Sequence, residues 1–342
     1  MRRWSFVLSL AALLLCSCNR KPSAPASSSA PPASLALYCS VDQEYAEAIL
    51  ARFSLLHPDI TITPLFDTET TKTTGLVERL RAEKSNPQAD FYWSSEIFLT
   101  IRLADEGLLA PLDLPDLADW PAQYCDPQRR WYAFAGRFRV IAFLDDPALP
   151  RPSSLLDLAA PDFKGLVIAD PNFGTTRGHV ASLFAALGPE NAARYLRDLK
   201  ANGVRVVASN SQAVREVTDG RARYALTDSD DVWAAQRNGA AITCVPAALL
   251  PDSGPLVIPN TLARIAGRPD SPAARAFALF LLSPETEKLL ADNDSHNLPL
   301  IHTDISLPAR YQLTVPASSL PYSDIAAHMD AAVRSANEIL LK

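Results

Sequence analysis

Along the first third of the chain, short continuous hydrophobic runs alternate with segments whose hydrophobic residues recur at helical spacing. Tyr45, Ile49, Phe53 and Leu56 show this helical spacing, and the run LYCSV at 37–41 is typical of a buried strand. Strands that alternate with helices in this way indicate a parallel sheet with helices on both faces. The predicted order is strand 34–41, helix 42–58, strand 59–67, helix 70–84, strand 89–95 and a helix over 96–109.

The same alternation returns in the middle of the chain, between two long apolar runs at 137–146 and 254–267. Both runs predict strands, and a second α/β unit is inserted between them. Two strands that cross between lobes form a hinge, with a ligand cleft at the carboxyl ends of both sheets. The other predicted elements are strands 166–171, 204–210, 222–229 and 241–246, and helices 172–188, 211–220, 229–239 and 271–292.

These patterns together predict an α/β protein of two lobes. Each lobe has a central, mostly parallel sheet flanked by helices, and two hinge strands join the lobes. The predicted segments are a signal peptide at 1–17, a tether at 18–34, the first part of lobe 1 at 35–140, the inserted lobe 2 at 141–254, the second part of lobe 1 at 255–305 and a C-terminal helical segment at 306–342.

The N-terminus has the layout of an export signal. Arg2 and Arg3 precede the apolar run FVLSLAALLL, which is too short to span a bilayer as a permanent helix. The following LCSC resembles the lipid-attachment motif of bacterial lipoproteins, with Cys18 as the lipidated residue. The next residues are rich in Pro, Ala and Ser, which is typical of a flexible tether. We therefore expect a lipid-anchored protein outside the cytoplasm. Cleavage without lipidation is the alternative, and it leads to the same side of the membrane.

Composition and motifs argue against several classes of protein. The 342 residues carry a formal net charge of −6 and no basic stripe, so nucleic acid is not expected as a partner. Cys39, Cys125 and Cys244 are widely separated and odd in number, so at most one disulfide is possible among them and buried thiols are expected. The sequence has no CxxC, HExxH or GxSxG motif, so neither a zinc site nor a serine hydrolase is predicted.

Polar residues gather where the predicted strands end and the helices begin, which is where open α/β sheets bind ligands. The stretch NFGTT places Gly174, Thr175 and Thr176 at a helix start, where backbone N–H groups and hydroxyls suit an anion. Ordinary threonine capping explains the same stretch. The further candidates at these junctions are Ser40 and Asp42 after the first strand, Thr70 and Lys72 after the second, Ser95 and Glu96 after the third, and Asn210 in the second lobe.

The stretch TDSDD at 227–231 places Asp228, Asp230 and Asp231 at the start of a predicted helix. The helix dipole stabilises acidic residues in a first turn by roughly 0.3–1 kcal/mol each. That effect explains one or two of them, whereas three close carboxylates repel each other unless a cation, hydrogen bonds or water offset the charge. Two interpretations stay open at this point: helix capping alone, or a role in binding a ligand.

From about residue 35 to residue 305, the chain resembles the bacterial extracellular solute-binding proteins of ABC importers, in the branch that includes the ferric-ion-binding proteins. The resemblance is carried by LYCSVDQEYAEAILARF, GLVERLRAEKSNPQADFYWSSE, RFRVIAF, NSQAVREVTDGRARYAL and LVIPNTLARI. It implies the two-lobed periplasmic-binding-protein fold and a transport role, in which a ligand contacts both lobes and stabilises the closed form. It also implies a membrane permease as partner, a monomer, and no catalysis or catalytic cofactor.

The resemblance is weakest at the iron site of the family. Ferric-binding members typically have two adjacent tyrosines, which fall here on Asp230 and Asp231, and Asp42 falls where a histidine is often found. A glutamate of the family falls on Ser95, with Glu96 beside it. The anion side of such sites matches better, at Gly174, Thr175, Thr176 and Asn210.

Two ligand hypotheses follow, and the sequence does not separate them. In the first, carboxylates converge as hard oxygen ligands around ferric iron or a divalent metal, with a synergistic anion. In the second, they bind hydroxyl or ammonium groups of an organic solute, whose phosphate, phosphonate or carboxylate lies on the anion side with Lys72. The family favours the first. A metal-dependent hydrolase is the rival from another class, and it lacks a general-base or nucleophile motif. The carboxylates are Asp42, Glu96, Asp230 and Asp231, with Asp228 as a further candidate.

Overall fold

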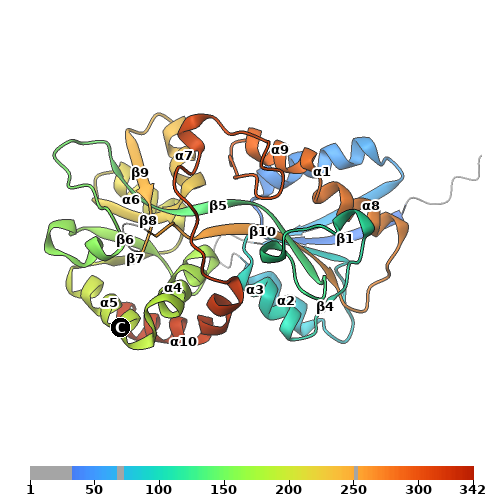
Figure 1. Cartoon of the computed structure of the whole chain (residues 1–342), viewed down its shortest axis with the longest axis horizontal. Helices are drawn as coiled ribbons and strands as arrows, with labels where there is room; N and C mark the ends of the chain where they lie inside the picture. The colour runs from blue at the N-terminus through green and yellow to red at the C-terminus, as the bar shows by residue number, and fades with distance from the viewer. Residues whose placement is uncertain (1–32, 68–72, 250–252) are drawn as a thin grey trace, which may run out of the picture. The chain divides into compact units, whose positions relative to one another are not determined.

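The computed structural model describes residues 33–67, 73–249 and 253–342, and residues 33–342 form one compact unit. The predicted signal peptide, most of the predicted tether, and Cys18, Thr70 and Lys72 lie outside the described residues. Two sheets share one long strand, β5 (Trp131–Leu144), which Figure 1 shows running from one sheet into the other. Within the described part of the chain, no helix combines the length and hydrophobicity that a membrane crossing requires.

The first sheet is built from elements at both ends of the folded chain. They are β1 (Ala33–Cys39), α1 (Gln43–Leu56), β2 (Ile60–Phe66), α2 (Thr74–Ala82), β3 (Phe91–Ser94), α3 (Phe98–Asp105), β4 (Leu109–Ala110), β10 (Val257–Ile265), α8 (Pro272–Leu281) and α9 (Pro284–Asp292). β1 lies parallel to β2 and β3, as predicted, and β10 is antiparallel to β3 and β5. Residues of α1 and α8 share a core with one face of this sheet, and residues of α2 and α3 pack against the other face.

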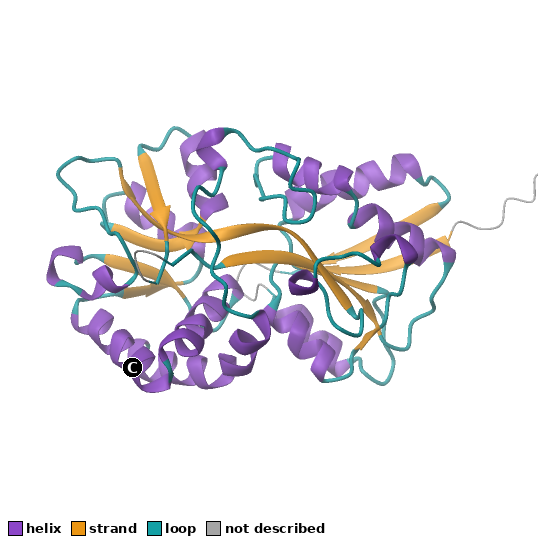
Figure 2. Cartoon of the chain, viewed as in Figure 1, coloured by secondary structure: helices purple, strands orange, loops and turns teal. Residues whose placement is uncertain are grey.

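The second sheet contains the inserted elements and the second half of β5. They are β6 (Leu166–Ala169), α4 (Gly174–Leu187), α5 (Pro189–Ala201), β7 (Arg205–Val207), α6 (Asn210–Thr218), β8 (Tyr224–Asp228), α7 (Ser229–Arg237) and β9 (Ile242–Pro246). β6 lies parallel to β7 and β8, whereas β5 is antiparallel to β8 and β9. The last helix, α10 (Tyr322–Leu340), packs against α4, α5 and α3. Figure 2 shows helices on both sides of the strands.

Several details differ from the sequence predictions. The helix α5 and the short strand β4 were not predicted. The single helix expected over 271–292 is two helices, because Ser283 accepts a hydrogen bond from the N–H of Thr286 and starts a new helix with Pro284 in its first turn. β1 begins at Ala33, so the strand includes the last two residues assigned to the tether. Cys39, Cys125 and Cys244 form no disulfide among the described residues; Cys39 is buried as predicted, whereas Cys125 and Cys244 are half-buried.

A β-bulge in β5 lies opposite β10. Gly136 pairs with Pro259 and Phe134 pairs with Asn260, so Ala135 is an extra residue in the ladder, and it has a φ of 35°. Asn260 Nδ2 donates a hydrogen bond to the carbonyl of Ala135 at 2.8 Å. Side chains two residues apart on a strand point to the same side. The bulge therefore determines which side of β5 residues 137 and 139 face.

A buried carboxylate of α9 holds this bulge. Glu287 is fully buried, and its Oε1 accepts hydrogen bonds from the backbone N–H groups of Ala135 at 2.8 Å and Leu300 at 3.0 Å. Its Oε2 accepts one from the N–H of His302 at 2.8 Å. A hydrogen bond to a charged group contributes about 1.5–3 kcal/mol. Glu287 thus ties α9, the bulge of β5 and the segment 300–302 together.

We expect Glu287→Ala to lower the free energy of unfolding by roughly 4 kcal/mol, because it leaves the buried N–H of Ala135 and the part-buried N–H groups of residues 300–302 without their acceptor. Glu287→Gln should cost less but still destabilise, because an amide NH₂ cannot accept from those groups. Urea denaturation followed by circular dichroism measures both. Glu285→Gln on the same helix is the matched control: its ion pair with Arg52 is exposed and should contribute less than about 1 kcal/mol. Equal effects of the changes at 285 and 287 would contradict this role of Glu287.

Candidate ligand-binding site

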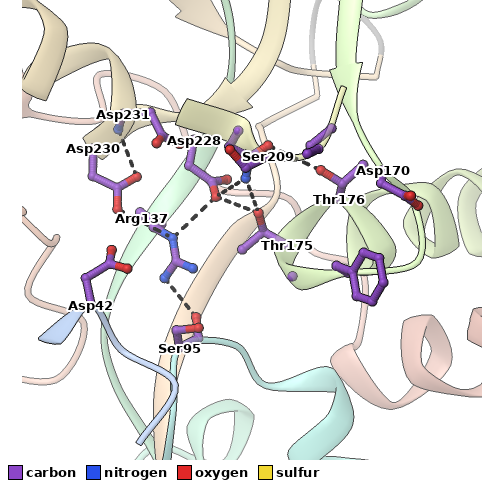
Figure 3. Close-up of a pocket in the computed structure, with 15 residues that line it drawn as sticks. Asp42, Ser95, Arg137, Asp170, Thr175, Thr176, Ser209, Asp228, Asp230 and Asp231 are labelled. Atoms are coloured by element: carbon purple, nitrogen blue, oxygen red, sulfur yellow. Dashed lines mark hydrogen bonds and ion pairs between the residues drawn. The ribbon is translucent and has the colours of Figure 1, made fainter. Parts of the chain in front are cut away.

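A small pocket of about 60 Å³ lies where the carboxyl ends of β1, β3, β6, β7 and β8 approach one another. Figure 3 shows its polar side chains, which come from both sheets and from β5 between them. This volume suits a small ion with its ligand atoms, or a few water molecules. The charged and polar lining residues, with Gly174, are Asp42, Ser95, Arg137, Asp170, Gly174, Thr175, Thr176, Ser209, Asn210, Asp228, Asp230 and Asp231.

Asp228, the last residue of β8, is the most densely bonded side chain of the site. It is only 3% exposed, and its Oδ1 accepts a hydrogen bond from Arg139 Nη1 at 2.8 Å. Its Oδ2 accepts from Thr175 Oγ1 at 2.5 Å and from Asn210 Nδ2 at 3.0 Å, and lies 3.4 Å from Arg137 Nε. Burial alone raises the pKa of this carboxyl. The charges of Arg139 and Arg137 outweigh burial and hold the pKa below its usual range.

The side chain of Arg137 connects the two sheets inside the pocket. Its Nη1 donates to the carbonyl of Ser95, after β3, at 2.8 Å. Its Nε lies 3.4 Å from Asp228 and 3.7 Å from Asp230, both of the second sheet. Burial lowers the pKa of Arg137, but the surrounding carboxylates, Asp230 first among them, raise it above its usual range. A fixed positive charge therefore lies among the aspartates (Figure 3).

The three aspartates of the TDSDD stretch lie close enough to share a cation. One carboxylate oxygen from each of Asp228, Asp230 and Asp231 lies within 4.8 Å of the others. Thr227 Oγ1 donates to Asp231 at 3.0 Å, and the N–H of Asp231 donates to Asp230 at 3.2 Å. Asp42, at the start of α1, lines the same pocket from the first sheet. Carboxylate oxygens are hard ligands that suit ferric iron and divalent metals.

Helix capping does not explain Asp228. It occupies the N-cap position of α7, but its side chain makes no capping hydrogen bond and is bonded to Arg139 and Thr175 instead. Asp230 and Asp231 do lie in the first turn of α7, where the helix dipole favours them. Of the two interpretations left open by the sequence, capping alone therefore fails for one of the three aspartates.

The four residues proposed for anion binding lie together at the starts of α4 and α6. Gly174 begins α4 with a φ of 52°, a conformation that glycine adopts readily. Thr176 Oγ1 donates to Asn210 Oδ1 at 3.2 Å, and Asn210 Nδ2 donates to Thr175 Oγ1 at 2.9 Å. These bonds join the two helix starts, and both Thr175 and Asn210 also bond to Asp228.

Two sequence candidates from the first sheet are not among the residues that line the pocket. Glu96 is buried at the start of α3, where its carboxylate accepts hydrogen bonds from the N–H groups of Phe98 at 2.6 Å and Leu99 at 3.1 Å. The structure thus separates Glu96 from the aspartates with which the sequence analysis grouped it. Ser40 lies behind Ser95 and accepts a hydrogen bond from the Ser95 N–H at 2.9 Å.

Arg137 and Arg139 are not among the residues predicted from the sequence, although the sequence carries a signal for them. They stand two residues apart in the otherwise apolar strand RFRVIAF, so both point to one side of β5. Charged residues are almost never fully buried unless paired, so two of them in a buried strand predict carboxylate partners. Arg139 is directly opposite Asp228 in the antiparallel ladder between β5 and β8.

The two sheets, the strand they share and the pocket between their carboxyl ends define a two-lobed ligand-binding protein. The sequence profile of the family described as "Bacterial extracellular solute-binding protein" matches residues 43–293, which is most of the chain. The chain therefore belongs to that family.

The sequence is also similar to several proteins with known names. The chain is 30% identical to the Fe(3+)-binding periplasmic protein of Serratia marcescens over 150 residues, 43% of this chain and 44% of that protein. It is 26% identical to iron uptake protein A1 of Synechocystis over 230 residues, 66% of this chain and 62% of that protein. The matched regions thus span only 44% and 62% of the length of these relatives.

Solved structures share the fold. A ferric binding protein from Campylobacter jejuni superposes with a TM-score of 0.77 at 22% identity, covering 89% of this chain and 99% of that one. Iron-bound HitA from Pseudomonas aeruginosa superposes with a TM-score of 0.77 at 23% identity, also covering 89% of this chain and 99% of the other. At these identities the likeness establishes the fold: the predicted two-lobed α/β architecture is confirmed.

The buried carboxyl of Glu96 predicts a pH-dependent stability. Burial raises its pKa to about 7, against the opposing effect of the Leu99 and Phe98 N–H groups. Between its unfolded and folded pKa values, the folded state binds more protons than the unfolded state, so stability falls as pH rises. From pH 5 to pH 8, the wild type should lose roughly 2–3 kcal/mol more than Glu96→Gln, which has no charge to bury. Urea denaturation at both pH values, without added metal, measures the difference. Parallel pH profiles of the two proteins would exclude a raised pKa.

Proposed function

We propose that this chain is the solute-binding component of an ABC importer and that it captures a metal ion of the iron type between its lobes. One observation carries the proposal: carboxylates from both sheets converge on a single small pocket, Asp42 from the first and Asp230 and Asp231 from the second. The named relatives, an Fe(3+)-binding periplasmic protein and an iron uptake protein, support a metal ion as the solute.

The charge of the pocket favours a cation over an organic anion. Among the described lining residues, the carboxylates of Asp42, Asp170, Asp228, Asp230 and Asp231 face one guanidinium, Arg137, and Arg139 lies directly behind. Negative charge is therefore in excess among these described lining residues. In a partly desolvated cavity such an excess attracts cations and repels phosphate or phosphonate groups.

A ligand held from both sheets explains how binding is signalled. Contacts to Asp42 on one side and to Asp230 and Asp231 on the other stabilise the closed arrangement of the lobes over the open one. The proposed hinge consists of the two long strands predicted at 137–146 and 254–267, which correspond to β5 and β10, with lobe limits at 35–140, 141–254 and 255–305. The closed form then docks on a membrane permease, and the chain acts as a monomer without catalysis.

A cation-binding test addresses this proposal directly. Metal-free protein should be stabilised by at least one member of a panel of ferric nitrilotriacetate, Mn(II), Zn(II) and Ca(II). A hundredfold excess over Kd should raise the melting temperature by about 5 °C. The double variant Asp230→Asn/Asp231→Asn should bind the cation with an affinity roughly tenfold or more lower than that of the wild type. Asp42→Asn, tested separately, should have the same effect, because each variant removes charged oxygen ligands.

Asp198→Asn, on the exposed side of α5, is the matched control and should bind the cation like the wild type. Differential scanning fluorimetry and elemental analysis of the purified protein supply the readouts. If no cation shifts the melting temperature, or if the variants at 42, 230 and 231 bind as tightly as the control, the proposed function is wrong.

The relatives are named as periplasmic proteins or iron uptake proteins, and we propose that this chain acts outside the cytoplasm as a lipoprotein anchored through Cys18. The wild type expressed in a bacterial host should then fractionate with membranes and be released by Cys18→Ala. A detergent-phase partition assay with mass spectrometry of the N-terminal peptide measures both. Cys16→Ala is the control and should remain with the membranes. Membrane retention of Cys18→Ala, or an unlipidated N-terminal peptide in the wild type, would rule out this anchor.

A further inference from the structure

Three donors that would suit a co-bound anion contact the same carboxylate of the protein. Thr175 Oγ1, Asn210 Nδ2 and Arg139 Nη1 donate to the carboxylate of Asp228 at 2.5, 3.0 and 2.8 Å. Thr175 and Asn210 are the helix-start residues that were predicted from the sequence to bind an anion, and Arg139 is closer to the Asp228 carboxylate than Arg137 is. Figure 3 shows the Asp228 carboxylate among these helix starts.

The position of Asp228 is fixed by the fold. It pairs directly with Arg139 in the ladder between β5 and β8, so the strand register holds both backbones. Arg139 is fully buried, and removal of its carboxylate partner would leave an uncompensated buried charge. The carboxylate therefore cannot leave the helix starts at low cost. Asp170, at the end of β6, adds a second carboxylate to the same side of the pocket.

An anion from solution would meet unfavourable conditions there. It would compete for the Thr175 and Asn210 donors that Asp228 already engages, and it would lie within a few ångströms of a like charge. The backbone N–H groups at the start of α4 form the positive end of the helix dipole and could still attract an anion. That attraction alone does not offset the repulsion from a neighbouring carboxylate.

We propose that Asp228 is a built-in anion: it occupies the place of a co-bound phosphate or carboxylate, so the site takes its cation without an exogenous anion. The claim that the site binds a cation rests on the proposed function. The claim that Asp228 occupies the place of an anion does not, because it concerns the protein without metal. Asp228 thereby determines whether the site requires a second ligand.

Inorganic phosphate is the probe, added to metal-free protein and followed by isothermal titration calorimetry and thermal melts. The wild type should show no binding isotherm and no rise in melting temperature at millimolar phosphate. Asp228→Asn keeps the size of the side chain and removes the like charge next to Arg139, so phosphate should bind it roughly tenfold or more tightly than the wild type. Asp198→Asn is the control and should behave as the wild type does.

A second measurement stands even if Asp228→Asn does not fold. Wild-type protein loaded with its cation in phosphate buffer, and again in citrate buffer, should show by native mass spectrometry the mass of protein plus cation alone. One equivalent of phosphate or citrate retained by the wild type would overturn the proposal, as would phosphate binding to the metal-free wild type or its absence in a folded Asp228→Asn protein.

The outcomes separate this inference from the proposed function. If no cation binds but phosphate binds only Asp228→Asn, the cation proposal fails while the assignment of Asp228 stands. If a cation binds the wild type together with one phosphate, the proposed function stands and Asp228 is not a built-in anion.

Discussion

The buried ion pair between Asp228 and Arg139 is the contact on which the binding region depends. Taking two charges out of water costs several kcal/mol per ion, and only good geometry with further hydrogen bonds offsets that cost. Thr175, Asn210 and Arg137 supply those further contacts. The pair thereby fixes β5 against β8 and draws the starts of α4 and α6 to the same point. Loss of either charge would affect the strand pairing, both helix starts and the pocket together.

The side of β5 from which Arg137 and Arg139 project depends in turn on a feature outside the pocket. The bulge at Ala135 shifts the alternation of β5, and Glu287 of α9 holds that bulge through hydrogen bonds to backbone N–H groups. β5 also belongs to both sheets, so a displacement at the bulge reaches the pocket through a single strand. The carboxylate of Glu287 and the carboxylate of Asp228 thus act on the same element from opposite ends, one through the backbone and one through side chains.

The sequence predicted most of the order of strands and helices because apolar periodicity reports burial directly, but α5 and β4 were missed. It also placed Asp42, Asp230 and Asp231 at the correct junctions, since helix starts follow strand ends in this architecture. It did not show that Glu96 turns toward α3, because the carboxylate accepts hydrogen bonds from the N–H groups of Phe98 and Leu99 at the start of that helix instead of lining the pocket. Nor did it show that Asp228 is paired with Arg139: strand register between residues 89 positions apart is a tertiary property. The break at Ser283 was visible in its Ser-Pro signature but was outweighed by continuous apolar spacing.

The pocket brings several carboxylates close together, and this crowding has an electrostatic cost. Carboxylates at this spacing repel each other, and part of that repulsion is offset by Arg137, whose Nε lies 3.4 Å from Asp228 and 3.7 Å from Asp230. Arg137 also donates to the Ser95 carbonyl of the first sheet, so its guanidinium contacts both sheets. The same arginine that offsets part of the negative charge of the carboxylates therefore connects the two sheets at the pocket.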